Sequence, residues 1–368
     1  MKIAPFALER FFAKHEFSVK HLACASDPDA LSVKEVLALE AGAESQFLSL
    51  GLGYGESVGH PALRQAIAGL FTAVSPEDVL VHAGAEEAIF AFMNVLLSAG
   101  DHVIVHTPAY QSLYEVAVSA GASVTRWGAR EEDGWQPDVE ALKKLIKPET
   151  KLLVINSPHN PTGALISRDR MDAIVTLARH HGIWLFGDEV YRGVEYGAPR
   201  NPSVVELYER GVSLGATAKV YGLAGLRVGW LVCRDRALLE QVATFKDYLT
   251  ICGAGPSEFL AALALRHSEV LATRTKKIVE ANVALMQRWI DERPSQFAWT
   301  RPVAGTTAFV RYVPGGSEAW ARDLLAQTGV LFLPGPIFDF ADTHFRVGLG
   351  RSALAAMLKL VPLHGRDT

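Results

Sequence analysis

Short apolar runs alternate with longer amphipathic stretches along most of the chain. The runs predict strands buried on both faces: "DVLVHAG" (78–84), "DHVIVHT" (101–107), "KLLVINS" (151–157), "GIWLFGDE" (182–189) and "RVGWLVC" (227–233). Two stretches between them have helical spacing and end in glycine, a common helix stop: "AEEAIFAFMNVLLSAG" (85–100) and "SRDRMDAIVTLARHHG" (167–182). This alternation predicts an α/β fold with a mostly parallel mixed sheet sandwiched by helices.

The C-terminal part of the chain has a different pattern. Residues 256–288 are apolar at helical spacing and predict one or two helices leading away from the sheet. Shorter strands are predicted around a helix at 317–328, in "AWTRPVAGTTAFVRY" (298–312), "GVLFLPG" (329–335) and "THFRVGLG" (343–350). A chain of 368 residues also exceeds the usual size of one hydrophobic core. We therefore predict a large domain over 45–265 and a smaller α+β domain formed by 1–44 plus 266–368.

Composition and charge narrow the class of partner. With 49% hydrophobic and 21% charged residues, the chain has the composition of an ordinary globular protein. A net charge of -4, with both signs interspersed, offers no basic surface for nucleic acid or an anionic membrane, so we expect a small-molecule partner. The N-terminal apolar run is broken by Glu9 and Arg10, and no stretch reaches the length of a membrane span. These features predict a cytoplasmic protein.

The cysteines do not point to a metal or a disulfide framework. Cys24, Cys233 and Cys252 lie far apart and form no CxxC pair. Without that spacing, neither a zinc site nor a set of disulfides is predicted. A reducing cytosol fits this pattern.

The segment "ATAKVYGLAGLRVGW" (216–230) places Lys219 among small and apolar residues. A lysine that loses hydration there has a pKa below the usual value of about 10.4, so more of it is the neutral, nucleophilic amine. Such an amine forms Schiff bases with carbonyls, and the commonest aldehyde held this way is pyridoxal phosphate (PLP). A surface lysine in a glycine-rich turn is the alternative at this point.

Other segments carry groups that such a cofactor needs. "FGDEVY" (186–191) supplies Asp188 at a strand end, where a buried carboxylate can keep a pyridine nitrogen protonated. "GAEEA" (84–88) opens a helix directly after a strand, so its N–H groups and the fork of Arg227 could hold a phosphate. The ring of Tyr110 could stack on the cofactor. Taken singly, each of these residues is more often part of a core or a turn.

The order of the segments identifies a family. From Tyr54 to Arg346, with "NSPHNPTG" (156–163) between them, they stand in the order and spacing of the fold-type I PLP-dependent enzymes. The chain resembles the class I/II aminotransferases, the family that includes the aspartate aminotransferases. The resemblance covers most of the chain, and "NPTG", "DEVY" and "AKVYGLAGLRVGW" together are highly specific. It implies a PLP-dependent transferase.

The resemblance also implies roles for single residues. Lys219 matches the lysine that forms the Schiff base and moves the proton between substrate and cofactor. Asp188 matches the acid on the pyridine nitrogen, and Asn160 and Tyr191 match the donors to the cofactor's phenolic oxygen. Tyr110 matches the aromatic residue that stacks on the ring. The phosphate contacts are implied at Gly84, Ala85, Glu86 and Arg227.

Substrate binding and assembly follow from the same resemblance. Arg346 matches the arginine that grips the substrate's α-carboxylate, for which a planar bidentate fork is suited, and Asn160 belongs to the same substrate site. Tyr54 matches a tyrosine that reaches the phosphate of the neighbouring subunit, which implies a homodimer with shared active sites. "PGPIF" (334–338) resembles the segment that closes over the substrate and excludes water.

The chain departs from the family pattern at two places. Ala216 stands where relatives often have a serine or threonine that binds the phosphate, and Thr217 is one position late. One phosphate contact is therefore expected to be missing. Glu86 is an unusual neighbour for a dianion, and we expect it to contribute only its backbone N–H, with its side chain turned away along the helix.

The reaction is less determined than the fold, because the same groups support transamination, elimination and cyclisation. We predict an aminotransferase that moves the amino group of an L-α-amino acid to a 2-oxo acid. A β-lyase or a cyclase is the alternative, since residues 21–40 weakly resemble the capreomycidine synthases, which cyclise a hydroxylated arginine. On this basis Asp27 is a candidate to face a basic substrate side chain; otherwise it caps the helix expected near "LSVKE" (31–35).

Two further hypotheses concern His159 and the whole chain. Relatives that act as lyases or on aromatic amino acids often have a histidine at the place of His159, which makes it a candidate on the substrate side. A non-catalytic regulator of this fold is the third alternative for the whole chain. Such regulators carry an added DNA-binding region, for which this chain has neither spare length nor a basic patch.

Overall fold

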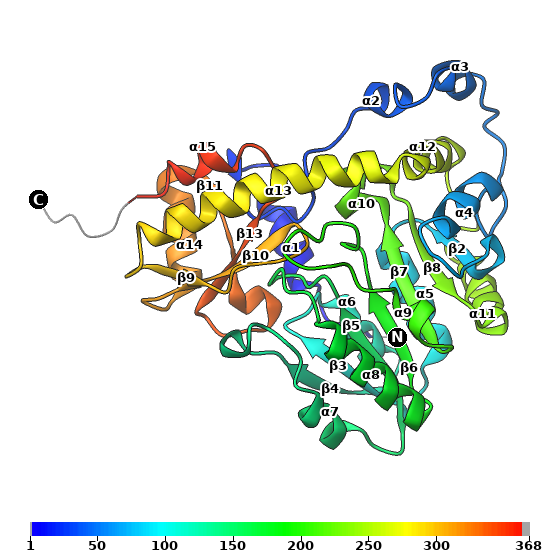
Figure 1. Cartoon of the computed structure of the whole chain (residues 1–368), viewed down its shortest axis with the longest axis horizontal. Coiled ribbons are helices and arrows are strands. Elements are labelled where there is room, and N and C mark those ends of the chain that lie inside the picture. Colours follow the sequence, from blue (N-terminus) through cyan, green and yellow to red (C-terminus); the bar gives the residue numbers. More distant parts are fainter. Residues whose placement is uncertain (1, 363–368) are drawn as a thin grey trace, which may run out of the picture.

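The large sheet has seven strands and helices on both of its faces (Figure 1). The computed structural model describes residues 2–362, so residue 1 and residues 363–368 of the predicted small domain lie outside the described residues. The sheet contains β2 (Val79–His82), β3 (His102–Thr107), β4 (Ser123–Gly128), β5 (Thr150–Asn156), β6 (Trp184–Asp188), β7 (Gly211–Ala216) and β8 (Gly229–Cys233). Their order is β2-β8-β7-β6-β5-β3-β4, with β8 antiparallel to both neighbours and the other pairs parallel. The predicted α/β fold with a mostly parallel sheet is confirmed.

The central strands are apolar throughout because both of their faces are covered. In β5, Leu152 and Val154 pack into the core shared with α5 (Ala85–Leu96), while Leu153 and Ile155 pack into the core shared with α8 (Arg168–His181). Side chains alternate between the faces of a strand, so a strand with a helix layer on each side has no solvent-facing positions. This is why the continuous apolar runs predicted buried strands correctly.

The helices around the large sheet follow the predicted pattern with one shifted end. Gly182 ends α8 in the left-handed conformation (φ 66°), as expected. α5 stops at Leu96, before the predicted glycine, because Leu97 is extended and the Ser98 N–H donates to Asp101 at 2.7 Å in a turn. The other helices of this region are α4 (Pro61–Ala68), α6 (Ser112–Ser119), α7 (Val139–Leu145), α9 (Val204–Leu207), α10 (Thr217–Val220), α11 (Arg236–Lys246), α12 (Gly255–Arg266), and the 3-10 turns η1 (Pro76–Asp78), η2 (Glu131–Asp133) and η3 (Ala224–Leu226).

The sequence reading missed two strands, β4 and β7. β7 has the sequence "GVSLGA", which lacks a run of β-branched residues. Its small residues are required by packing, because a Cβ on Gly215 would lie 2.3 Å from the indole nitrogen of Trp230. β4 is an edge strand with several exposed side chains, so its pattern is not that of a core strand.

A second, antiparallel sheet lies below the long helix α13 (Ser268–Asp291), which crosses the upper part of the molecule in Figure 1. Its order is β12-β13-β10-β9, from β9 (Phe297–Trp299), β10 (Thr307–Tyr312), β12 (Leu333–Pro334) and β13 (His344–Gly348). α14 (Ser317–Thr328), η4 (Gly335–Phe338) and α15 (Leu354–Leu358) complete this part. The predicted apolar stretch at 256–288 is thus two helices, α12 and α13. The boundaries at 44/45 and 265/266 stay a prediction.

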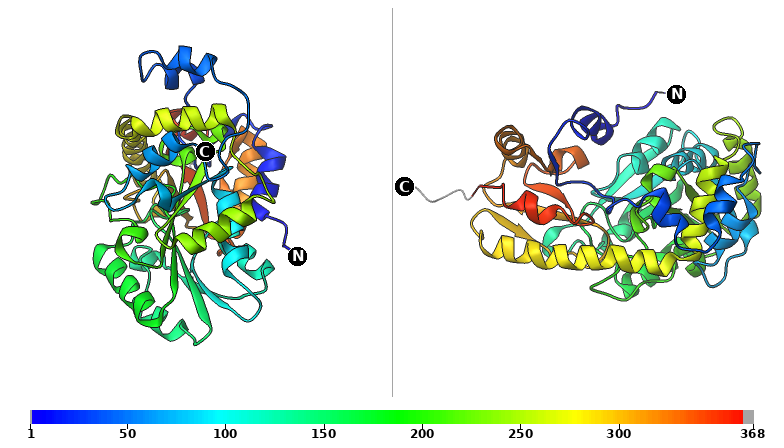
Figure 2. Two further views of the ribbon diagram at one scale, coloured as in Figure 1. Left: turned by 90° about the vertical axis from the view of Figure 1, so that its right-hand side faces the viewer. Right: turned by 90° about the horizontal axis from the view of Figure 1, so that it is seen from above.

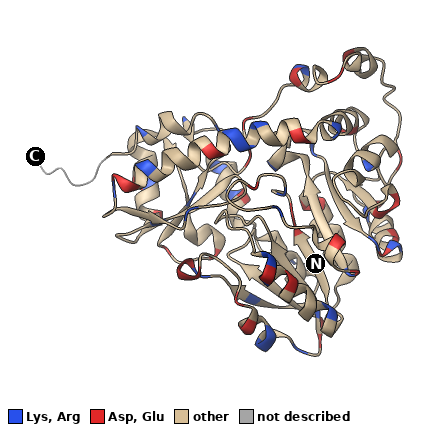
Figure 3. Ribbon diagram, viewed as in Figure 1, with Lys and Arg blue, Asp and Glu red and all other residues tan. Residues whose placement is uncertain are grey.

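The N-terminal segment touches both parts of the molecule. β1 (His21–Leu22) pairs in parallel with β11 (Val330–Leu331), and α1 (Ala7–His15) lies between the two sheets in the right-hand view of Figure 2. α2 (Val33–Leu37) and α3 (Ala43–Leu48) stand away from the rest of the chain in Figure 1. Basic and acidic residues are interspersed along the helices (Figure 3). Among residues 2–362, no helix is both long and apolar enough to span a membrane.

Candidate active site

Lys219 lies on α10, the short helix that follows β7. Its Nζ donates a hydrogen bond to Oγ of Ser26 at 2.8 Å, so the side chain points toward the N-terminal segment. Burial lowers the pKa of Lys219 below its ordinary value, although the nearby carboxylates of Asp27 and Asp188 favour the charged form. The fold therefore provides the desolvated amine that the sequence predicted.

Asp188 is the last residue of β6 and is 6% exposed. Burial raises the pKa of its carboxyl group to about 7, while the N–H of Val190, 3.3 Å from Oδ1, and the charge of Lys219 lower it. Because Asp188 and Lys219 each influence the other's pKa, their side chains belong to one site at the carboxyl edge of β6 and β7. This edge is where open α/β sheets bind ligands.

The loop after β5 brings Asn160 to the same edge. Asn156, the last residue of β5, fixes this loop: its Oδ1 accepts from the Asn160 N–H at 2.6 Å, and its Nδ2 donates to the Asp188 carbonyl at 2.8 Å. Tyr191 is 2% exposed, and burial raises the pKa of its hydroxyl above the ordinary value. A buried tyrosine that keeps its proton can serve as a hydrogen-bond donor.

Arg346 reaches this site from β13 of the second sheet and is 1% exposed. Its Nε and Nη2 donate to the Cys24 carbonyl at 3.1 and 2.9 Å, and its Nη1 donates to Oδ1 of Asn160 at 3.1 Å. The ring centroid of Phe338, in the predicted closing segment, lies 5.3 Å from the guanidinium carbon. The fork of Arg346 is therefore held in place by both parts of the molecule.

Gly84 and Arg227 form a cradle at the start of α5. Gly84 is the N-cap residue with φ 93°, and no side chain caps the first N–H groups of the helix. A Cβ on Gly84 would lie 2.5 Å from Nη2 of Arg227, so only glycine allows the guanidinium to approach this closely. Gly229 is needed for a similar reason, since its Cβ would lie 2.6 Å from the Ala85 nitrogen. The free N–H groups and the guanidinium together suit a phosphate.

Thr217 does not replace the phosphate donor that Ala216 lacks. Its side chain is 1% exposed, and its Oγ1 lies 3.2 Å from the carbonyl oxygens of both Leu223 and Val228. The hydroxyl is thus used to close the loop around Lys219. This is consistent with the expected absence of one phosphate contact.

The side chain of Glu86 does not turn away from the site. Its Oε2 is buried and has no hydrogen-bond partner among the described residues. Burial raises the pKa of Glu86 to about 7, and the negative charges of Glu9 and Asp188 raise it further. The raised pKa favours the neutral form of Glu86, which lessens the like-charge conflict with a phosphate.

Residues 5–27, which we call the N-terminal cover, lie over the strand ends. The Ala7 N–H donates to Oε1 of Gln111 at 2.8 Å, and Oε1 of Glu9 accepts from the Tyr110 hydroxyl at 2.8 Å. The cover also supplies the oxygen that accepts from Lys219 and the carbonyl that accepts from Arg346. Tyr110, expected to stack on a ring, is thus oriented by the cover.

The cover carries carboxylates close to one another. Burial raises the pKa of Glu16, and the negative charges of Asp27 and Glu9 raise it further, while Arg351 and Lys219 lower it. Asp27 is paired through Oδ2 with Nη2 of Arg351 at 3.0 Å. Glu9 and Glu16 form no ion pair among the described residues, so their charges favour a positively charged group in the space beside Lys219.

Asp27 does not cap the nearby helix, so that alternative is wrong. Ser32 caps α2, accepting from the Glu35 N–H at 3.2 Å in a reciprocal capping box with the Glu35 side chain. A serine with a glutamate three residues later provides the better local cap, which leaves Asp27 free for its contact with Arg351.

Tyr54 and His159 occupy contrasting positions. Tyr54 is 93% exposed, so its ring makes little contact with its own chain. His159 is 2% exposed; its Nδ1 lies 2.7 Å from Oγ1 of Thr162, and its ring packs on His106 at 4.7 Å between centroids. His159 is thus packed inside its own loop and against β3.

Sequence reasoning missed Ser26, Glu9, Glu16 and Arg351. Ser26 is separated from Lys219 by 193 positions, and no local pattern marks it. Glu9 and Glu16 lie on or next to an amphipathic helix, where acidic residues are usually solvated. Only their placement by the fold indicates a role.

Comparisons with known proteins show which family the chain belongs to. The chain matches the family "Aminotransferase class I and II" over residues 24–357. It is 32% identical to capreomycidine synthase of Streptomyces vinaceus, covering 85% of this chain and 82% of that protein, and 33% identical to arginine–pyruvate transaminase of Pseudomonas aeruginosa, covering 80% and 77%. The structure superimposes on a PLP-dependent aminotransferase from Streptococcus suis with a TM-score of 0.93 and 33% identity, over 98% of this chain and 97% of that one.

The chain belongs to the class I and II aminotransferase family and is a PLP-dependent transferase of fold type I. The residues at the site fit this cofactor. The uncapped start of α5 and Arg227 suit the phosphate, buried Asp188 suits the ring nitrogen, and the Lys219 amine suits the aldehyde.

Proposed function

We propose that the protein transfers the amino group of an L-α-amino acid with a cationic side chain, such as arginine, to a 2-oxo acid. The observation that supports amino transfer is the meeting of Lys219, Asp188 and Arg346 at one edge of the large sheet. Each is a group that the reaction needs: a neutral amine, a buried acid and a carboxylate-binding fork.

Each residue has a separate task in this proposal. Bound PLP supplies the electron sink for the electron pair left on the α-carbon when its proton is removed. Lys219 takes that proton on Nζ and returns it, which requires the neutral amine favoured by burial. Asp188 keeps a proton on the ring nitrogen, and Arg346 binds the α-carboxylate, next to Asn160. Tyr191 would donate a hydrogen bond from its buried hydroxyl group to the phenolic oxygen of the cofactor.

The substrate's side chain is proposed from the charges of the N-terminal cover. The charges of Asp27 and Glu9 influence the pKa of Lys219, and the same two charges and that of Lys219 influence the pKa of Glu16. These interactions indicate that the three carboxylates lie around the amine. A guanidinium or ammonium group would neutralise them at short range. The similarity to an arginine–pyruvate transaminase supports the same class of substrate.

The test of the substrate class is a ratio of specificities. Purified protein loaded with PLP is assayed with L-arginine and with L-leucine as donors, and with pyruvate and 2-oxoglutarate as acceptors. We expect kcat/KM for arginine to exceed that for leucine, and Asp27→Asn to reduce this ratio about threefold to tenfold. If Asp27→Asn leaves the ranking of donors unchanged, the proposed contact is wrong.

Cyclisation or elimination is a second candidate, supported by particular relatives. Besides the similarity to capreomycidine synthase, the structure superimposes on a PLP-dependent cyclase with a TM-score of 0.90 and 26% identity. Acceptor dependence separates the candidates: an aminotransferase consumes the donor only when a 2-oxo acid is present. A cyclase or lyase needs a leaving group on the β-carbon, which arginine and leucine lack, so it is assayed with a β-hydroxylated arginine, which it consumes with loss of water and without any acceptor. A β-lyase acting on a β-substituted alanine releases the β-substituent, pyruvate and ammonia, also without an acceptor.

We also propose a homodimer with shared active sites. Tyr54 belongs to an exposed apolar surface with Leu48 (76% exposed) and Leu52 (84%). The buried ammonium of Lys246 donates to the Ser57 carbonyl at 2.5 Å, which joins this segment to the one that carries the exposed Tyr248, Leu249 and Ile251. Large exposed apolar side chains on joined segments favour an interface.

Mixing of inactive subunits tests the shared site. Lys219→Ala and Tyr54→Ala proteins are unfolded together, refolded and assayed. If Tyr54 serves the neighbouring subunit, each mixed dimer contains one intact site, so about one quarter of the wild-type sites are restored. Activity no higher than that of the separately refolded Tyr54→Ala protein would refute sharing.

A further inference from the structure

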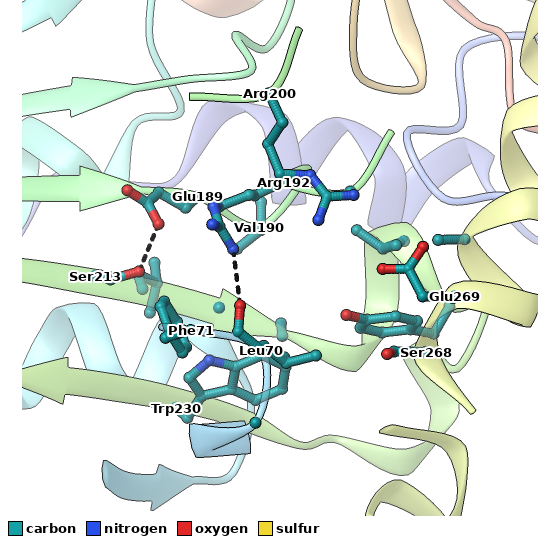
Figure 4. Close-up of a pocket in the computed structure, with 18 residues that line it drawn as sticks. Leu70, Phe71, Glu189, Val190, Arg192, Arg200, Ser213, Trp230, Ser268 and Glu269 are labelled. Carbon is teal, nitrogen blue, oxygen red and sulfur yellow. Dashed lines mark hydrogen bonds between the residues drawn. The ribbon is translucent and has the colours of Figure 1, made fainter. Parts of the chain in front are cut away.

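A second cavity, of about 200 Å³, lies beside the active site (Figure 4). It is bounded by the end of α4, the loop after β6, the end of β7 and the first turn of α13. Asp188 and Lys219 do not line it, but their chain neighbours Glu189, Val190 and Val220 do. The cavity is therefore separate from the cofactor site and shares its walls.

Hydrogen-bond donors of the cavity wall are only partly used. Nη1 of Arg192 donates to the Leu70 carbonyl at 3.3 Å, and Nη2 is 3.5 Å from Oε2 of Glu206, but Nε has no partner among the described residues. The indole N–H of Trp230, which packs against Gly215, forms no hydrogen bond among the described residues either. Unused donors in a largely buried wall are costly unless something accepts from them.

Two charged side chains face the same space. Figure 4 shows Arg200 and Glu269 pointing toward one another across the cavity, on the side away from Trp230. Arg200 donates through Nε to Glu195 at 3.0 Å and keeps its remaining N–H groups, while Glu269 forms no ion pair among residues 2–362. Both act electrostatically on Tyr221, a further lining residue.

Glu189, the other acidic residue of the cavity wall, already has hydrogen-bond partners. Glu189 accepts from the Val204 N–H at 2.8 Å and from the Ser213 hydroxyl at 2.7 Å, so its carboxylate is held in the wall. Glu269 is therefore the acid available to a ligand, facing a group of cationic and neutral donors. Such a site suits a molecule that carries both charges.

We propose that this cavity binds a small free α-amino acid as a zwitterion. Arg192, Arg200 and the Trp230 N–H receive its carboxylate, and Glu269 receives its ammonium group. A cavity of roughly 150 Å³ accommodates benzene, so about 200 Å³ holds an amino acid the size of alanine but not of arginine. The ligand would contact α13, which links the two sheets, β7, which ends shortly before Lys219, and the loop that follows Asp188.

The test uses 2-aminoisobutyrate, an alanine-sized amino acid without an α-proton, titrated into the PLP-loaded protein. Heat of binding reports every site, and the visible band of the cofactor reports the active site. We expect a binding step that leaves the visible band unchanged. Glu269→Gln and Arg200→Gln should each weaken that step about tenfold, because each removes a charged hydrogen bond.

Two controls decide the interpretation. Glu280→Gln changes an exposed acid on the same helix, outside the cavity, and should leave the binding step as in the wild type. Trp230→Phe removes only the indole donor and should weaken the step by a smaller factor. The inference is overturned if every heat signal follows the visible band, or if Glu269→Gln and Arg200→Gln bind as the wild type does.

Discussion

The strand ends and the N-terminal cover meet at one site but are built differently. Asp188 at the end of β6 and Arg346 in the middle of β13 are almost fully buried, and Arg346 is held by backbone and amide oxygens. In the cover, Glu9, Glu16 and Asp27 are held mainly by other side chains, such as Tyr110 and Arg351. Replacing a side chain that binds backbone atoms leaves those atoms without a partner, which costs free energy. Partners that are side chains can instead rearrange.

This difference separates the reaction from its specificity. Buried groups have strongly shifted proton affinities, which suit them to proton transfer and charge stabilisation. The acids of the cover are closer to solvent and act through charge on whatever lies between them and Lys219. We therefore expect substitutions at the strand ends to remove activity, and substitutions in the cover to change the choice of substrate.

The largest effect is expected at Lys219. Lys219→Ala removes both the covalent attachment and the proton carrier, so the amino-transfer rate should fall about 10⁴-fold or more. The visible band of the loaded protein should be lost or shifted as well. Lys151→Ala, at a partly exposed lysine on β5 that pairs with Asp101, serves as the matched control and should retain activity. A Lys219→Ala protein within tenfold of the wild type would contradict the assignment.

Asp188 should make the stability of the cofactor-free protein depend on pH. Its folded pKa is about 7, against an ordinary value of 3.8, so between these pH values the folded protein holds a proton that the unfolded chain has released. Stability must then fall as pH rises from about 4 to 7. Asp188→Asn removes this dependence, and its free energy of unfolding relative to wild type should rise by up to about 4 kcal/mol across that range.

Urea unfolding of both apoproteins at several pH values measures this difference. Because both proteins keep Glu86 and the remaining carboxyl groups, the difference isolates residue 188. Parallel stability curves would show that Asp188 ionises as an ordinary aspartate and would weaken its proposed role at the ring nitrogen.

Arg346 should affect substrate binding more than proton transfer. Arg346→Lys keeps the charge but loses the bidentate fork, so KM for the amino donor should rise about tenfold to 100-fold with a smaller change in kcat. Arg311→Lys, on the neighbouring strand β10, is the matched control, since its side chain is 46% exposed and pairs with Glu131. An equal rise in KM in both variants would indicate a general effect on the small sheet.

The smallest effect is expected in the cover. Glu9→Gln keeps the acceptor for the Tyr110 hydroxyl but removes a charge, so KM should rise about threefold for arginine and remain unchanged for leucine. Glu240→Gln, an exposed acid on α11, should change neither value. A similar loss for arginine and leucine would show that Glu9 only orients Tyr110, and the contrast between strand ends and cover would then fail.

The sequence by itself determined the large sheet and the order of the motifs around it. Continuous apolar runs predicted β2, β3, β5, β6 and β8 because a strand covered on both faces has no polar positions. The position of Asp188 at a strand end followed from the same pattern, whereas the strand before Lys219 was not predicted. The family resemblance added the cofactor. β7 was not predicted because it lacks a run of β-branched residues, and its Gly215 is required by packing against Trp230 of the neighbouring strand β8.

Only the tertiary structure decided what surrounds these residues. The contact between Lys219 and Ser26 spans 193 positions, and that between Arg346 and Cys24 spans 322. The inward turn of Glu86 and the second cavity also arise from segments that are distant in sequence. Local patterns report the periodicity of a segment and its own chemistry, whereas burial and charge at a site depend on which distant segments the fold brings to it.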